Sequence, residues 1–226
     1  MRAHRGFTIA EVLTVMVIVA LMLGAVAFAM PIILKGPLEA QSQVDNVQQA
    51  ALALYKIQRD TRQSRLSGIF NCSVTPVVAC SPQGGQATST QALVIVTADN
   101  GSGQFKVDTG SQNNGATAGD PKWQGFIVYW LSPNADGTSN DLKRAFFPLA
   151  IASKNNGAPI VAAADAVTAL TIVLAVTGAV TVAQDVRSIS AAEDSTTGIL
   201  ALRVDGGTTS GNLSSMSLSG NTYVRN

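Results

Sequence analysis

One long apolar run near the N-terminus constrains this chain more than any other feature. Between Phe7 and Leu34 the only formally charged residue is Glu11. A helix rises about 1.5 Å per residue, so a helix over this run exceeds the hydrocarbon core of a bilayer, which is about 30 Å thick. The sequence therefore predicts a membrane-spanning helix. Because Arg2 and Arg5 precede it, the positive-inside rule predicts a cytoplasmic N-terminus and an outer remainder.

Two ordinary interpretations of the run compete with a third. A cleaved secretory signal fits the basic start and the small residues of Ala27-Phe28-Ala29 or Ala25-Val26-Ala27, giving a mature start near Met30. The usual apolar region of such signals covers only about 7 to 15 residues, however. A plain anchor would keep Met1, but a carboxylate in lipid costs about 2.5 to 3.5 kcal/mol on insertion scales. Glu11 therefore calls for a function.

The third interpretation comes from the residues around this acid. The stretch Gly6-Phe7-Thr8-Ile9-Ala10-Glu11-Val12-Leu13 resembles the class III signal of type IV pilins and pseudopilins. In that signal a short basic leader ends in glycine, phenylalanine follows, and glutamate is the fifth residue after the cut. Pro31 is similar to the proline that many members carry near this depth. The resemblance covers only the N-terminal part of the chain.

The resemblance implies processing by a membrane prepilin peptidase. The enzyme would remove residues 1–6 as a leader, cut between Gly6 and Phe7, and methylate the new amine of Phe7. Glycine leaves the cut unobstructed because it has no side chain. Glu11 would be the docking residue, paired with the Phe7 ammonium of a neighbouring subunit, which fixes the register of assembly. The alternative for Glu11 is an acid that merely favours the helix macrodipole.

The same resemblance implies a structural subunit of a type IV pilus or a type II secretion-type pseudopilus. Its partners would be other pilin or pseudopilin subunits, an inner-membrane assembly platform and motor, and membrane lipid. The protein would reside in the cytoplasmic membrane and then in a fibre in the periplasm or at the cell surface. Gln58–Gln63 and the terminal Val224-Arg225-Asn226 are more similar to minor pilins and J-type minor pseudopilins. A secreted or membrane-anchored binding domain, such as an adhesin, is the alternative.

The helix is expected to continue beyond the membrane. Lys35-Gly36-Pro37 predicts a bend or short break, after which apolar residues recur at helical spacing. We expect a long helix over residues 7–66, divided into 7–34 and 38–66, with its second half packed under a head by an apolar stripe. That stripe comprises Val44, Val47, Ala51 and Leu54.

Residues 67–226 are predicted to form a β-rich head, which gives an α+β fold. Turn residues accumulate after Gly68, and β-branched runs favour strands. The expected strands are Ala92–Ala98, Gly125–Leu131, Lys143–Ala150, Val167–Val182 in one or two pieces, Gly198–Val204 and Ser215–Val224. The polar segments Asn100–Lys122 and Gly206–Asn212 are expected to be surface loops.

The two cysteines, Cys72 and Cys80, lie eight positions apart with Pro76 between them. A small disulfide loop could close at this spacing in an oxidising compartment. A pair of buried thiols is the alternative. One pair cannot form an all-cysteine tetrahedral metal site within a single chain.

Residues suited to catalysis are sparse. The only histidine, His4, falls in the expected leader, which argues against a catalytic triad or a histidine-ligated zinc site. Asn134–Asp141 offers oxygen ligands around Gly137 but lacks the pattern of an EF-hand, so a hairpin turn is preferred. Gly84-Gly85 and Gly101-Ser102-Gly103 lack the lysine of a phosphate-binding loop. We predict no enzyme, metal or cofactor.

Nucleic acid is a further partner to weigh. The 15 Lys and Arg against 14 Asp and Glu give a net charge of +1, which provides no global attraction for a polyanion. Arg59, Arg62 and Arg65 share a helix face that could contact DNA, although such runs are usually solvated or paired. Six aromatic residues are expected in the core rather than on a base-stacking surface: Trp123, Phe126, Tyr129, Trp130, Phe146 and Phe147.

Overall fold

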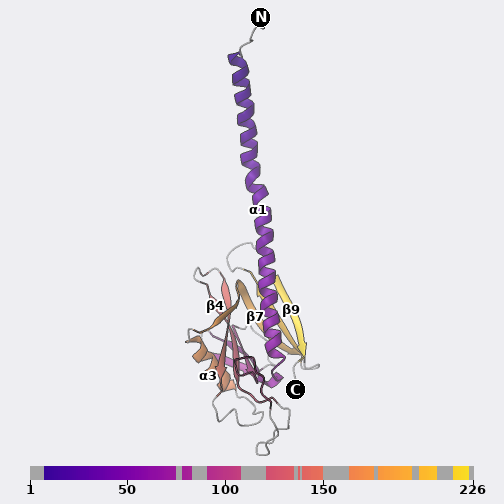
Figure 1. Cartoon of the computed structure of the whole chain (residues 1–226), viewed down its shortest axis with the longest axis vertical. Coiled ribbons are helices and arrows are strands. Elements are labelled where there is room, and N and C mark those ends of the chain that lie inside the picture. The colour runs from indigo at the N-terminus through magenta and orange to yellow at the C-terminus, as the bar shows by residue number, and fades with distance from the viewer. Residues whose placement is uncertain are drawn as a thin grey trace, which may run out of the picture. The chain divides into compact units, whose positions relative to one another are not determined.

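The structure, a computed structural model of the whole chain, describes residues 8–74, 78–82, 91–107, 121–134, 137, 139–149, 163–175, 178–194, 199–207 and 216–223. The chain divides into two compact units, Met1–Val44 and Asp45–Asn226. Among its described residues, the first contains the N-terminal part of one long helix, which begins at Ile9. The second contains the end of that helix, two antiparallel sheets and a shorter helix (Figure 1).

Helix α1 runs without interruption from Ile9 to Thr61. The short break expected as one possibility at Lys35-Gly36-Pro37 is therefore wrong, while the other possibility, a bend, stays a prediction. A proline removes one backbone hydrogen bond, but its fixed φ of about −65° is compatible with a helix, and the bonds on either side can persist.

The end of α1 also differs from the expected boundary at residue 66. After Thr61 the hydrogen bonds tighten to three-residue steps, from the Gln63 N–H to the Asp60 carbonyl and from the Ser64 N–H to the Thr61 carbonyl. Such bonds are common in the last turn of a helix. A short 3₁₀ turn, Leu66–Gly68, then leads into the first strand.

The head is built from two antiparallel sheets. A six-stranded sheet has the order β2-β1-β3-β4-β5-β6, and a three-stranded sheet has the order β7-β8-β9. The first sheet comprises β1 Ile69–Ser73, β2 Ala79–Pro82, β3 Ala92–Thr97, β4 Gly125–Pro133, β5 Asn140–Pro148 and β6 Val180–Ala183. The second comprises β7 Val186–Asp194, β8 Ile199–Gly206 and β9 Met216–Tyr223. The expected α+β fold with a β-rich head is thus confirmed.

Five of the expected strands correspond to β3, β4, β5, β8 and β9, whereas β1, β2 and β7 were not foreseen. The expected strand over Val167–Val182 is wrong in its first part, which lies in helix α3, Ala163–Leu174. The buried residues of α3 are Ala166, Ala169, Leu170 and Val173. They recur at helical spacing, so packing on one face of the sheet overrides the strand propensity of the β-branched residues.

The six-stranded sheet is covered on both faces. Strand β3 is buried along its whole length. Its residues Leu93 and Ile95 pack in a cluster with α1 and the three-stranded sheet, while Val94 and Val96 pack in a second cluster with α3. Coverage on both faces explains why this strand is a continuous apolar run rather than an alternating one.

The aromatic residues belong to these two clusters, as expected. Trp123, Phe126, Tyr129 and Trp130 are buried. The side chains of Phe146 and Phe147 are partly buried against the clusters. The four buried rings therefore do not form a surface for stacking bases.

The face of α1 that packs in the head is not the expected stripe. Ala50, Ala53 and Ile57 are buried, whereas Val44 is 53% exposed and Ala51 is exposed. Leu54 of the expected stripe is only partly buried, against the first cluster, and Val47 is half-buried. Two of the three buried residues, Ala50 and Ala53, are small.

Strand β8 approaches that face closely at a glycine. A Cβ placed on Gly206 would lie 3.4 Å from the Cβ of Ala50. Only small side chains allow this approach. A sequence pattern based on large apolar residues does not detect them.

Cys72 and Cys80 are directly opposite each other on β1 and β2, and their Sγ atoms are bonded at 2.05 Å. The bond joins the four-residue edge strand β2 to β1. In the structure this pair is therefore a disulfide between neighbouring strands rather than two buried thiols.

Replacing both cysteines by serine should lower the free energy of unfolding by about 2 to 3 kcal/mol, because the disulfide restricts the unfolded chain. Thermal unfolding of the full chain in detergent, with and without a thiol reductant, measures the effect. The reductant should lower the transition temperature of the original chain and leave the double-serine variant unchanged. An original chain that is insensitive to the reductant would count against the disulfide.

Candidate functional site: the first turn and apolar surface of α1

The first turn of α1 is closed by a reciprocal pair of hydrogen bonds between Thr8 and Glu11. The Thr8 N–H donates to Oε2 of Glu11 at 3.0 Å, and the Glu11 N–H donates to the Thr8 hydroxyl at 3.3 Å. The Thr8 hydroxyl also donates to the same carboxylate oxygen, at 3.1 Å. This arrangement is a capping box, which satisfies backbone donors that a helix start leaves free.

The capping box was missed in the sequence although its signal is present there. Thr8 and Glu11 have the S/T-x-x-E spacing of the motif. The box gives Glu11 two neutral donors within its own chain, so its carboxylate is hydrogen bonded before any other molecule arrives. Neutral donors leave the negative charge of the carboxylate in place, so a cation can still pair with it.

Loss of the Thr8 hydroxyl should loosen this turn. In a Thr8→Val variant we expect a loss of about 1 kcal/mol of local stability, measured as roughly fivefold faster hydrogen exchange of the Glu11 amide by NMR in detergent micelles. Thr14→Val is the matched control, because the Thr14 hydroxyl bonds back to the Ala10 carbonyl and does not cap the helix. Equal exchange in both variants would contradict the cap.

The surface that follows the capped turn is apolar and uncovered. Ile9–Met30 has a mean hydropathy of 2.8 and no part of it is buried within the chain. Its large side chains stand out, with Ile9 82% and Phe28 78% exposed. At about 1.5 Å per residue, the 22 residues extend about 33 Å, enough to cross the hydrocarbon core.

Glu11 is the one proposed site residue on this surface that the structure describes. Its side chain is exposed in the first turn of α1. Gly6 and Phe7, the proposed cleavage positions, lie outside the described residues. The structure thus places the acid but not the amine with which it is proposed to pair.

The turn Gly101-Ser102-Gly103 does not resemble a phosphate-binding loop. The N–H groups of Gly101 and Gly103 both donate to Oδ1 of Asp99, at 2.8 and 2.9 Å. Those N–H groups are therefore already used by a carboxylate. Gly84-Gly85 lies outside the described residues.

The segment Asn134–Asp141, compared above with an EF-hand, lies where β4 and β5 pair as a hairpin. Pro133 pairs with Asn140, and the Asn134 N–H donates to the Ser139 carbonyl. Asp136 lies outside the described residues, and within the described ones no three His, Cys, Asp or Glu side chains gather as a metal site. The hairpin interpretation is confirmed for the residues that the structure describes.

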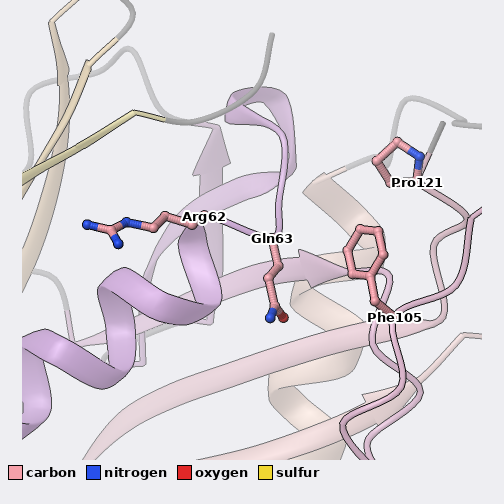
Figure 2. Close-up of a pocket in the computed structure, with 4 residues that line it drawn as sticks. All are labelled: Arg62, Gln63, Phe105 and Pro121. Carbon is pink, nitrogen blue, oxygen red and sulfur yellow. The ribbon is translucent and has the colours of Figure 1, made fainter. Parts of the chain in front are cut away.

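A shallow cavity of about 420 Å³ lies just beyond the end of α1, lined by Arg62, Gln63, Phe105 and Pro121. Figure 2 shows the guanidinium of Arg62 directed away from Phe105 and Pro121. The Nε of Arg62 instead donates to the Thr222 hydroxyl at 3.4 Å. This arginine is bonded within the head, and the cavity gathers no acid, thiol or second cation among its described lining residues.

Comparison with known proteins points to the N-terminus. The family model of the prokaryotic N-terminal methylation motif matches residues 1–27. No curated protein and no solved structure matches the chain. The matched residues contain the glycine, the phenylalanine and the acid singled out above, and they continue into the exposed apolar helix. The chain therefore carries the class III prepilin signal of type IV pilins and pseudopilins, which indicates a pilin-type substrate of prepilin peptidase.

Proposed function

We propose that the protein is a structural subunit of a type IV pilus or a type II secretion-type pseudopilus, processed by prepilin peptidase and assembled through its N-terminal helix. The observation that carries this proposal is the methylation motif over residues 1–27 leading into the uncovered apolar part of α1. In this proposal Gly6 and Phe7 flank the cut, Phe7 is methylated, and Glu11 is the docking residue. We propose a structural role and no catalysis.

The exposed surface of Ile9–Met30 supports assembly. Leu13, Met16 and Leu21 are each more than half exposed, and burying one such side chain fully is favourable by about 1.5 to 3 kcal/mol. A helix with an uncovered surface of this kind needs lipid or other apolar helices around it. A precursor in the membrane and a subunit in a helical bundle meet that need in turn.

The expected orientation places the head outside the cytoplasm. Arg2 and Arg5 favour a cytoplasmic N-terminus. The disulfide of β1 and β2 supports the same orientation, because disulfides persist in oxidising compartments. The proposed partners are other pilin or pseudopilin subunits, an inner-membrane assembly platform and its cytoplasmic motor.

Labelling of thiols in whole cells tests this orientation. We expect Cys80, the half-buried member of the pair, to resist a membrane-impermeant maleimide until a reductant is added, and then to react without cell lysis. A cysteine introduced in place of Ser217, which is exposed on β9, should react without reductant and serves as the positive control. Labelling that requires lysis in every case would place the head in the cytoplasm.

Recovery of the chain in sheared fibres tests assembly itself. In a host that makes such fibres, we expect the protein in the sheared fraction only when the motor ATPase is active. A motor-inactive host should retain it in the membrane fraction. Release into the medium that is independent of the motor would favour the alternative, a secreted or anchored binding domain.

A further inference from the structure

One buried acid lies at the end of α1, far from the signal. Asp60 is in the last helical turns and its side chain is only 1% exposed. Its Oδ2 accepts hydrogen bonds from the Tyr129 hydroxyl at 2.6 Å and from Nε of Arg144 at 2.8 Å. Its Oδ1 accepts bonds from Nε and Nη2 of Arg59 at 3.3 and 3.2 Å. We call Asp60, Tyr129 and Arg144 the helix-end clasp.

The position of Asp60 is unfavourable without these partners. The C-terminal end of a helix carries partial negative charge, so an acid there is repelled. Removing a carboxylate from water costs several kcal/mol unless it is paired and hydrogen bonded. Donors on two strands of the sheet, Tyr129 and Arg144, offset both costs. Helix stability alone therefore disfavours an acid at this position.

The two strand residues present their donors together. Tyr129 on β4 and Arg144 on β5 are directly opposite in the register of the sheet, so their side chains share one face. Burial raises the pKa of Tyr129 well above its usual value of 10, which keeps the phenol protonated as a donor. Burial alone would lower the pKa of Arg144, but the Asp60 carboxylate raises it overall.

We infer that Asp60 is a positioning residue that locks the last turn of α1 onto strands β4 and β5. The clasp fixes where the helix stops and in which register it lies on the sheet. Its consequence for a fibre rests on the proposed function. In a subunit assembled through its N-terminal helix, this turn would help to hold the head on that helix. The lock itself is a property of the single chain and is measured without any fibre.

Hydrogen exchange on the full chain in detergent micelles tests the lock. The reporters are the amides of Arg62, Gln63 and Ser64, which bond to carbonyls of the last turn. Asp60→Asn should speed their exchange by about 100-fold, because one partner of a buried ion pair is lost. Tyr129→Phe removes a single hydrogen bond to a charged group and should speed it by about 10-fold.

Matched controls come from the same residue types on the exposed side of α1. Asp45→Asn and Tyr55→Phe change a carboxylate and a phenol that are exposed on the helix, and both should leave exchange unchanged. If Asp60→Asn fails to fold, Tyr129→Phe still tests the lock. In the double variant Asp60→Asn, Tyr129→Phe, the two effects should not add, because both residues act through one carboxylate.

The pattern of exchange separates a lock from general packing. The lock predicts fast exchange confined to the last turn, with the amides of β3 and β8 unchanged. Uniform acceleration across the strands, or rates equal to those of the controls, would overturn it. Failure of the chain to enter fibres would contradict the proposed function and leave this measurement untouched.

Discussion

Glu11→Gln should insert into the membrane and be cleaved normally, and its incorporation into fibres should fall by about 100-fold. Glutamine retains the capping box with Thr8, because either Glu or Gln serves at that position. It removes the charge, however. If the carboxylate pairs with the methylated amine of Phe7 on a neighbouring subunit, its loss leaves that cation unpaired in an apolar bundle, at a cost of about 3 kcal/mol or more. Quantitative immunoblots of membrane and sheared-fibre fractions measure the ratio.

Because Glu11 also caps the helix, Glu11→Gln tests the charge more specifically than Glu11→Ala does. Glu11→Ala removes both the cap and the charge, whereas Thr8→Val weakens the cap alone. A docking role predicts poor incorporation of both Glu11 variants and near-normal incorporation of Thr8→Val. If Glu11→Gln is incorporated like the original chain, Glu11 acts only as a helix cap and the docking role fails.

Gly6→Val should stop removal of the leader, with a loss of about 100-fold or more in the rate of processing. The proposed reason is steric: a branched side chain at the cut would displace the scissile peptide, and a shift of about 1 Å at a reacting centre can cost about 100-fold. Pulse-labelled precursor and mature forms, separated by gel or by mass, give the rate. The unprocessed form should accumulate in the membrane.

Gly24→Val is the matched control for this change. A Cβ on Gly24 meets no atom within 4 Å, so the helix has room for the new side chain. We expect normal processing of that variant. Equal processing of Gly6→Val and Gly24→Val would show that the cut does not lie where the signal places it.

The N-terminal helix could be predicted because its signal is local. The run from Phe7 to Leu34 contains one charge, and no tertiary contact is needed to recognise a span of that length and hydropathy. Strands β3 and β4 were found for a similar reason, since apolar and β-branched runs bounded by turn residues are strand signals. The capping box of Thr8 and Glu11 is equally local, because its S/T-x-x-E spacing is visible in the sequence.

The features that failed depend on what lies across the fold. The segment now in α3 is rich in β-branched residues, and only its packing on the sheet selects a helix. The buried face of α1 includes Ala50, which Gly206 approaches closely, and a search for large apolar residues cannot detect that approach. In each case the deciding contact is distant in sequence.

Asp60 shows the limit most clearly. In the sequence it lies between Arg59 and Arg62, and no local pattern distinguishes it from an acid on a solvated helix face. Its partners, Tyr129 and Arg144, are 69 and 84 positions away. Nothing local identifies a buried acid whose donors come from two strands. Two arginines of the basic helix face are bonded within the head, as is usual for such runs: Arg59 donates to Asp60 and Arg62 donates to Thr222.

Mass spectrometry of the N-terminal peptide tests the central claim most directly, on protein isolated from a host that has prepilin peptidase. The proposed function predicts a mature chain that begins at Phe7 with a methyl group on its amine. A chain that still begins at Met1, or one that begins near Met30, would contradict it, because the amine proposed to meet Glu11 would never be formed.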